Sequence, residues 1–287
     1  MGLRVVAAIA VVATLAASAA YLVARGASGG ARAGNDRTMG VAPAPDLTPL
    51  DECVVDLGAR QRALSSVEAR AATSLIAYGM RHGVPEVSVA RALDRAFTRQ
   101  PGFSLGPRRT REVFEGLPKG PPSPDGLALV RALDGTRAAA LTCRYVTPDR
   151  NDQRLEANGL TPRANELRRA FVGVFGRLPM GGFAPGGVDS GHVDGSSHYE
   201  GRAIDVFFRP ASEPNQRRGW VFANWLTAHA EQYSVLSVIY DDHIWTVWAS
   251  AVGWRDYLHP SGDTTDPVLR HLDHVHVAVV GGPWHPQ

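Results

Sequence analysis

Two short stretches, SSHYEGRAID at residues 196–205 and HLDHVHV at residues 271–277, decide how the second half of this chain folds. The residues from Ala203 to Phe208 and from His274 to Val280 are mostly apolar or β-branched, which is typical of short strands. Histidine and carboxylate side chains occur in and beside both runs. We therefore expect two strands of one sheet to carry the polar residues of a single site.

The positions of these polar residues allow them to meet on one face of the sheet. His198 precedes the first strand and Asp205 lies on it, and Gly201 lets the chain bend between them. His274 and His276 are two residues apart, so their side chains share one face of the second strand while the neighbouring valines share the other. One carboxylate with two imidazoles is a ligand set that suits zinc and leaves a fourth position for water.

A zinc ion in such a site would make hydroxide available at neutral pH, because it lowers the pKa of bound water to about 7. Each of the three residues alone is more typical of a surface or core position, and only their combined spacing favours a metal. Ser196 is expected to orient a ligand through a hydrogen bond. His192, His243 and His271 are expected to be polar loop residues or residues that support the site.

The remaining elements of this half predict an α+β domain over residues 155–287. Thr161-Pro162 is a strong helix start, with a capping hydroxyl and a proline in the first turn, and the helix should run to about Phe175. Two further strands are expected, and a helix near Gln216–Ala230 lies between the first strand and these. The added strands are Val235–Ile239 and Ile244–Trp248. A mostly antiparallel sheet with flanking helices is the architecture that fits this order.

The pattern S-x-H-x-x-G-x-A-x-D followed by a distant H-x-H resembles that of the D-alanyl-D-alanine metallopeptidases. This group includes carboxypeptidases, vancomycin-resistance peptidases and the zinc domain of hedgehog proteins. The resemblance covers about residues 159–280 and extends to one branch of secreted actinobacterial proteins. It implies that Zn²⁺ is held by His198, Asp205 and His276, and that an amide in the peptide stems of peptidoglycan is cleaved, by a D,D-carboxypeptidase or an endopeptidase.

The resemblance leaves two candidates for the group that takes a proton from water. In the dipeptidase members a glutamate three residues before the last ligand has this role, and Asp273 is at that position here. In other members the first histidine of H-x-H is catalytic, which is His274 in this chain. Relatives also carry an arginine after a Gly-aromatic pair, where it holds the substrate carbonyl or carboxylate. Here Ala184 follows Phe183, and Arg202 is a candidate replacement.

Residues 51–145 are predicted to form a helical domain. Apolar residues recur at helical spacing from about Ser65 to Arg81, near 86–98 and near 126–141. The segments 83–85 and 90–93 resemble a lysozyme-like helical module of secreted actinobacterial proteins, but its catalytic glutamate is missing from residues 94–98. The resemblance implies a degenerate copy that binds glycan or acts as a spacer, and an unrelated helical spacer is the alternative.

The N-terminus predicts export. Residues 5–24 form an uncharged and mostly apolar run that is long enough to cross a bilayer. Residues 1–25 are therefore expected to be a signal peptide or a membrane anchor, and residues 26–50 a flexible linker. Cys53 and Cys143 bracket the first half, and a disulfide between them is expected in an extracytoplasmic compartment.

Composition excludes one class of partner and leaves three classes of function. The net charge of +2, with no basic stripe along the chain, argues against a dedicated nucleic-acid-binding protein. We expect the partners to be peptidoglycan peptide and, if residues 5–24 are retained, the membrane. A zinc hydrolase is the first hypothesis. The rivals are a zinc-stabilised wall-binding protein without turnover and an envelope domain whose histidines bind no metal.

Overall fold

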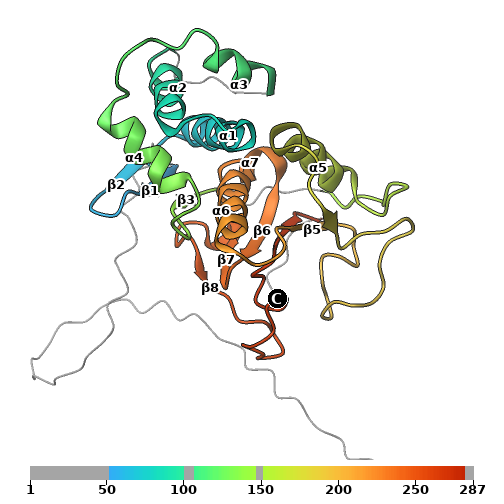
Figure 1. The fold of residues 1–287 in the computed structure, drawn as a ribbon. Helices are drawn as coiled ribbons and strands as arrows, with labels where there is room; N and C mark the ends of the chain where they lie inside the picture. The colour runs from blue at the N-terminus through green and yellow to red at the C-terminus, as the bar shows by residue number, and fades with distance from the viewer. Residues whose placement is uncertain (1–51, 100–106, 147–150, 282–287) are drawn as a thin grey trace, which may run out of the picture. The chain divides into compact units, whose positions relative to one another are not determined.

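The described residues, 52–99, 107–146 and 151–281 of the computed structural model, form an α+β fold, as the sequence predicts (Figure 1). The predicted export segment and linker, residues 1–25 and 26–50, lie outside the described residues. Within the part of the chain that is described, no helix has the length and apolar character needed to span a membrane.

A small antiparallel sheet joins the two ends of the first half. Its strands are β1 (Cys53–Asp56), β2 (Gln61–Leu64) and β3 (Leu141–Cys143), in the order β2-β1-β3. This sheet could not be predicted from the sequence, because strands of three or four residues are too short to show an alternating pattern. Cys53 lies directly opposite Cys143 in the register, and the predicted disulfide joins them.

Among the described residues of the first half, four helices follow β2. They are α1 (Ser66–His82), α2 (Glu86–Arg99), α3 (Pro107–Phe114) and α4 (Pro124–Leu133). Ser65 and Glu68 form a capping box at the start of α1, and Gly83 ends that helix in the left-handed conformation with a φ of 62°. The prediction of a helix near 126–141 is wrong in its extent. Helix α4 ends at Leu133, and the chain then turns through Gly135 toward β3.

The second half is built on a six-stranded sheet in the order β4-β5-β9-β6-β7-β8, in which every pair is antiparallel. The strands are β4 (Met180–Gly181), β5 (Ala203–Phe207), β6 (Val235–Tyr240), β7 (His243–Thr246), β8 (Arg255–Asp256) and β9 (His274–Val279). The helices are α5 (Pro162–Phe175), α6 (Glu213–Ala228) and α7 (Ala230–Tyr233), with a short 3₁₀ turn at Val247–Ala249. The hydroxyl of Thr161 caps α5, as its sequence predicts.

The two faces of this sheet have different neighbours. Helix α6 covers one face (Figure 1). The ring of Trp220 on this helix packs edge-on against Tyr240 of β6. Val275 and Val277 of β9 lie on the covered face and are almost fully buried. The opposite face carries the polar residues of β5 and β9, because alternate side chains of a strand point to opposite sides.

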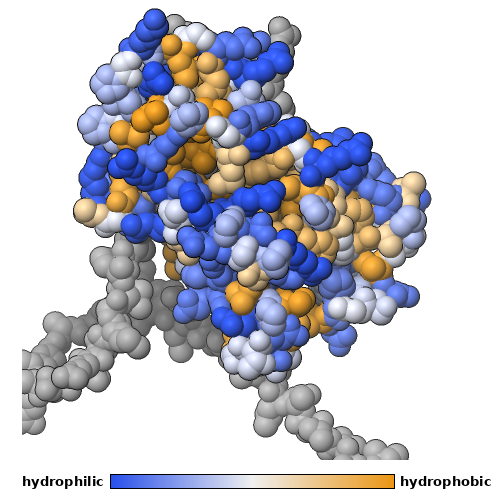
Figure 2. Space-filling view, viewed as in Figure 1, coloured by the Kyte–Doolittle hydropathy of each residue, from blue (hydrophilic) through white to orange (hydrophobic). Residues whose placement is uncertain are grey.

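The two halves share one hydrophobic core. Trp225 of α6 donates a hydrogen bond to the hydroxyl of Ser74 on α1, and Tyr145 donates to the carbonyl of Ala228. Buried residues from Cys53 to Val279 belong to one continuous cluster. On the face shown in Figure 2 most residues are hydrophilic, with apolar surface gathered between the helices of the first half.

Removal of the Cys53–Cys143 disulfide should destabilise the folded chain. The bond closes a loop with a sequence separation of 90 residues, and a bond of this kind contributes about 2 to 5 kcal/mol to the free energy of unfolding. We expect the double variant Cys53→Ala/Cys143→Ala to show this loss in urea unfolding. Wild-type protein kept reduced should unfold with the variant, and equal stability of oxidised protein and variant would contradict the prediction.

Candidate metal centre

Three side chains from two strands and a turn converge on the polar face of the sheet. The register of β5 with β9 sets Asp205 directly opposite His276, and His198 lies in the turn before β5. His276 Nδ1 lies 3.0 Å from His198 Nε2 and 3.1 Å from Asp205 Oδ1. His198 Nε2 lies 3.3 Å from Asp205 Oδ1. These three residues are close enough to hold a metal ion.

The orientation of the His198 ring is set by the backbone of Gly182. His198 Nδ1 lies 2.7 Å from the Gly182 carbonyl oxygen, so Nδ1 carries the proton and Nε2 presents its lone pair to the cluster. Gly182 has a φ of +78°, and a Cβ at this position would lie 2.3 Å from His198 Cε1 and 3.0 Å from Asp205 Oδ2. Glycine is thus required here both for the turn and for the space.

The charge states of the cluster suit a cation. Burial alone would raise the pKa of Asp205, but hydrogen bonds with His198 and His276 and the charges of these residues hold it far below its ordinary value. Burial lowers the pKa of His276. An ionised carboxylate and a neutral imidazole are the forms that coordinate a metal.

His274, Asp273 and Arg209 form a chain of contacting side chains that reaches the cluster from the start of β9. His274 Nε2 lies 4.0 Å from Asp205 Oδ1, and its Nδ1 lies 2.7 Å from Asp273 Oδ1. Arg209 Nε donates to the second oxygen of Asp273 at 2.5 Å. Asp273 therefore fixes the His274 tautomer whose Nε2 faces the cluster, and Arg209 holds Asp273 in place.

Two further histidines border the cluster. The ring of His192 is stacked on that of His198, with centroids 3.9 Å apart, and the Tyr199 hydroxyl bonds both the backbone N–H and the carbonyl of His192. The ring of His271 lies 4.6 Å from that of His274. Burial and the neighbouring His274 and His276 lower the pKa of His271 to about 3, so it is neutral.

Of the two residues expected to assist the site, Ser196 contacts the backbone of His198, whereas Arg202 has contacts away from the cluster. Ser196 Oγ accepts from the backbone N–H of His198 at 3.4 Å, which orders the turn and leaves the ring to Gly182. Arg202 donates to the carbonyl of Val279 at 2.9 Å and pairs with Glu200. Arg202 is three positions before Asp205, so the two side chains point to opposite faces of the sheet. Because Arg202 is also held by Val279 and Glu200, the structure does not bring it to the cluster.

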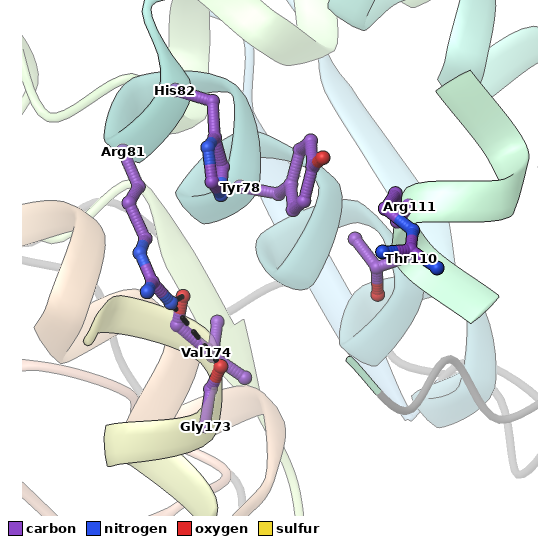
Figure 3. Close-up of a pocket in the computed structure, with 7 residues that line it drawn as sticks. All are labelled: Tyr78, Arg81, His82, Thr110, Arg111, Gly173 and Val174. Atoms are coloured by element: carbon purple, nitrogen blue, oxygen red, sulfur yellow. Dashed lines mark hydrogen bonds between the residues drawn. The ribbon is translucent and has the colours of Figure 1, made fainter. Parts of the chain in front are cut away.

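A separate cavity of about 320 Å³ lies between α1, α3 and α5 (Figure 3). It is lined by Tyr78, Arg81, His82, Thr110, Arg111, Gly173 and Val174. Arg81 donates to the carbonyls of Gly173 and Val174 at the end of α5, where cationic groups are favourable. His198, Asp205 and His276 do not line this cavity. The position of Arg81 in it is explained by its hydrogen bonds with the end of α5.

One family model is similar to part of this chain. A family model described as "VldE, C-terminal domain" matches residues 156–268. The match includes His198 and Asp205 and ends before His274 and His276. No curated protein and no solved structure matches this chain.

The contributions of Gly182 and Arg209 were not predicted from the sequence, whereas His192 lies beside the cluster as one of the histidines expected to support it. The Gly181-Gly182 pair is a visible signal for a close backbone approach. Nothing in the sequence around Arg209 links it to Asp273, because 63 residues separate the two and only the β5–β9 pairing brings them together.

Replacing Gly182 with alanine should lower the affinity for Zn²⁺ more than the same replacement at a glycine that has open space around it. A Gly182→Ala variant should bind Zn²⁺ at least about tenfold more weakly, because its methyl group would collide with the His198 ring and displace a ligand. Gly186→Ala is the matched control, since Gly186 has a similar φ of +86° and open space around it. Titration with Zn²⁺ measures both, and equal affinities would refute the prediction.

Proposed function

We propose that residues 155–287 form a zinc-dependent hydrolase that cleaves amide bonds in the peptide stems of peptidoglycan. The observation that carries the proposal is the convergence of His198, Asp205 and His276, together with His274 aimed at the same point. The peptidoglycan substrate rests on the resemblance of the H-x-x-G-x-A-x-D and H-x-H motifs to the D-alanyl-D-alanine metallopeptidases.

The donor atoms and their spacing fit zinc. Zinc bonds to imidazole nitrogen and carboxylate oxygen are about 2.0–2.2 Å long, so donor atoms in a tetrahedral site lie about 3.3 Å apart. The three observed separations are 3.0, 3.1 and 3.3 Å. Three protein ligands also leave one position open, which is typical of catalytic rather than structural sites.

The chemistry divides between the ion and the side chains. A bound zinc ion would supply a Lewis acid that polarises the scissile carbonyl and makes water more acidic. His274 Nε2 takes the proton of the water that adds to the carbonyl carbon, and it returns this proton to the amide nitrogen as the C–N bond breaks. Asp273 holds the His274 tautomer that this task needs, through the 2.7 Å contact with Nδ1.

The site of action is proposed to be outside the cytoplasm. The Cys53–Cys143 disulfide supports an oxidising compartment, and the apolar run at residues 5–24 supports export or anchoring of the chain. Peptidoglycan is found in that compartment.

A non-catalytic, zinc-stabilised protein that binds the cell wall is the second candidate. It is favoured by the segment after Gly182, where Phe183 is followed by Ala184 and not by the arginine that the resemblance leads us to expect. It predicts the same metal content and peptide binding, with no hydrolysis.

Zinc content and peptide hydrolysis together test the proposal. The full chain should be used, because its two halves share one core. We expect about one zinc ion per chain in the wild type, loss of zinc in His198→Ala, and no loss in the control His259→Ala, whose side chain bonds Ser261. Zinc without hydrolysis of cell-wall peptides would favour the binding protein, and absence of zinc after its addition would reject both candidates.

The roles of His274 and Asp273 should separate in kinetics. His274→Gln removes the group that moves the proton, so kcat should fall about 10²- to 10⁴-fold. Asp273→Asn should cost less, about 10- to 100-fold, because it loosens the orientation of His274 and leaves the ring. Both variants should retain zinc, since neither residue is among the three proposed ligands. A larger loss in Asp273→Asn than in His274→Gln would reverse the assignment.

A further inference from the structure

A guanidinium group lies beside the metal cluster on the same face of the sheet. Arg209 follows β5 closely, and its guanidinium carbon lies 4.1 Å from the centroid of the Phe207 ring. Phe207 shares the face of Asp205, since they are two positions apart on the strand, and it is paired with His274 across the sheet. The side chain of Arg209 is 51% exposed.

Within the described part of the chain, one of the three guanidinium nitrogens of Arg209 has a hydrogen-bond partner. Arg209 Nε bonds Asp273, and among the described residues no hydrogen bond is made by the two Nη atoms. These two atoms carry four of the five N–H groups of the planar fork. Because the ring of Phe207 and the carboxylate of Asp273 fix the plane, the fork is held ready to bind a planar anion such as a carboxylate.

The spacing along β5 between Asp205 of the cluster and Phe207 beneath the fork is of the size of one amino-acid residue with its hydrogen bond. Asp205 and Phe207 are about 6.6 Å apart along the strand, and the guanidinium lies over Phe207. In a peptide, the carboxylate carbon of the last residue is under about 4 Å from the carbonyl carbon of the preceding one. A hydrogen bond of about 2.9 Å spans the rest.

We propose that Arg209 binds the free C-terminal carboxylate of the substrate, so that the site removes the last residue of a peptide and does not cut within a longer strand. This inference rests on the proposed hydrolase and names the substrate class of that same site. Arg209 takes the place of the arginine that is absent after Phe183, and it comes from a different part of the chain, the segment just after β5.

The alternative role for Arg209 is to position Asp273 alone. The two roles differ in what they predict for the substrate. A positioning residue affects every substrate alike, whereas a carboxylate-binding residue matters only when the carboxylate is present. An N-acyl peptide ending in D-alanyl-D-alanine, compared with the same peptide amidated at its C-terminus, separates them.

The test uses the full chain as wild type, as Arg209→Met, and as the control Arg218→Met. Arg218 is also an arginine near an aromatic ring, 6.0 Å from the centroid of Phe208, but Phe208 is a buried core residue outside the metal cluster. Steady-state kinetics of the zinc-loaded protein give KM and kcat for both peptides. NMR titration of the metal-free protein gives the affinity for both peptides without depending on turnover.

We expect wild type and Arg218→Met to bind the carboxylate peptide at least about tenfold more tightly than the amide, and to cleave it with a correspondingly lower KM. Arg209→Met should lose this preference through KM and in the titration, and its affinity for the amide should stay within about twofold of wild type. Equal wild-type affinity for the two peptides, or a preference that survives in Arg209→Met, would overturn the proposal. Absence of hydrolysis would count against the hydrolase, while the titration would still decide the role of Arg209.

Discussion

The pairing of β5 with β9 is the constraint on which the rest of the site depends. It sets Asp205 against His276 and Phe207 against His274, so one register places a carboxylate, both imidazoles and the ring beneath Arg209 on one face. A slip of one residue would move each side chain of the shifted strand to the other face. The slip is opposed by Val275 and Val277, which would have to leave the core. Hydrophobic burial behind the sheet therefore fixes the polar geometry in front of it.

The first half of the chain supports this register from behind. Helix α6 lies between the sheet and α1, and it is joined to α1 by the bond from Trp225 to Ser74. The second connection runs from Tyr145, just after β3, to the end of α6. A helix that is buried on both sides cannot shift without disturbing both contacts, since protein interiors are closely packed. The helical half thus contributes to the rigidity of the sheet.

The sequence was sufficient where local chemistry determines the structure, and insufficient where distant contacts do. The hydroxyl of Thr161 starts a helix through bonds within one turn, so that start could be predicted. The strands of the polar face were visible from their composition, and the grouping of His198, Asp205 and His276 from their spacing. The end of α4 was missed because the alanine run at 138–140 favours a helix, although Asp134-Gly135 just after Leu133 is a turn signal and β3 needs an extended chain to pair with β1. The contact of Arg209 with Asp273 depends wholly on the fold.

The structure also distinguishes two carboxylates that look alike in the sequence. Asp205 contacts two imidazoles within the cluster, whereas Asp273 has one oxygen on His274 and the other on Arg209. Burial would raise the pKa of Asp273, but these two partners lower it below its usual value. A carboxylate with a lowered pKa is a weaker base, and both of its oxygens are already engaged. These contacts favour Asp273 as the residue that orients an imidazole, and His274, with Nε2 open toward the cluster, as the residue that moves the proton.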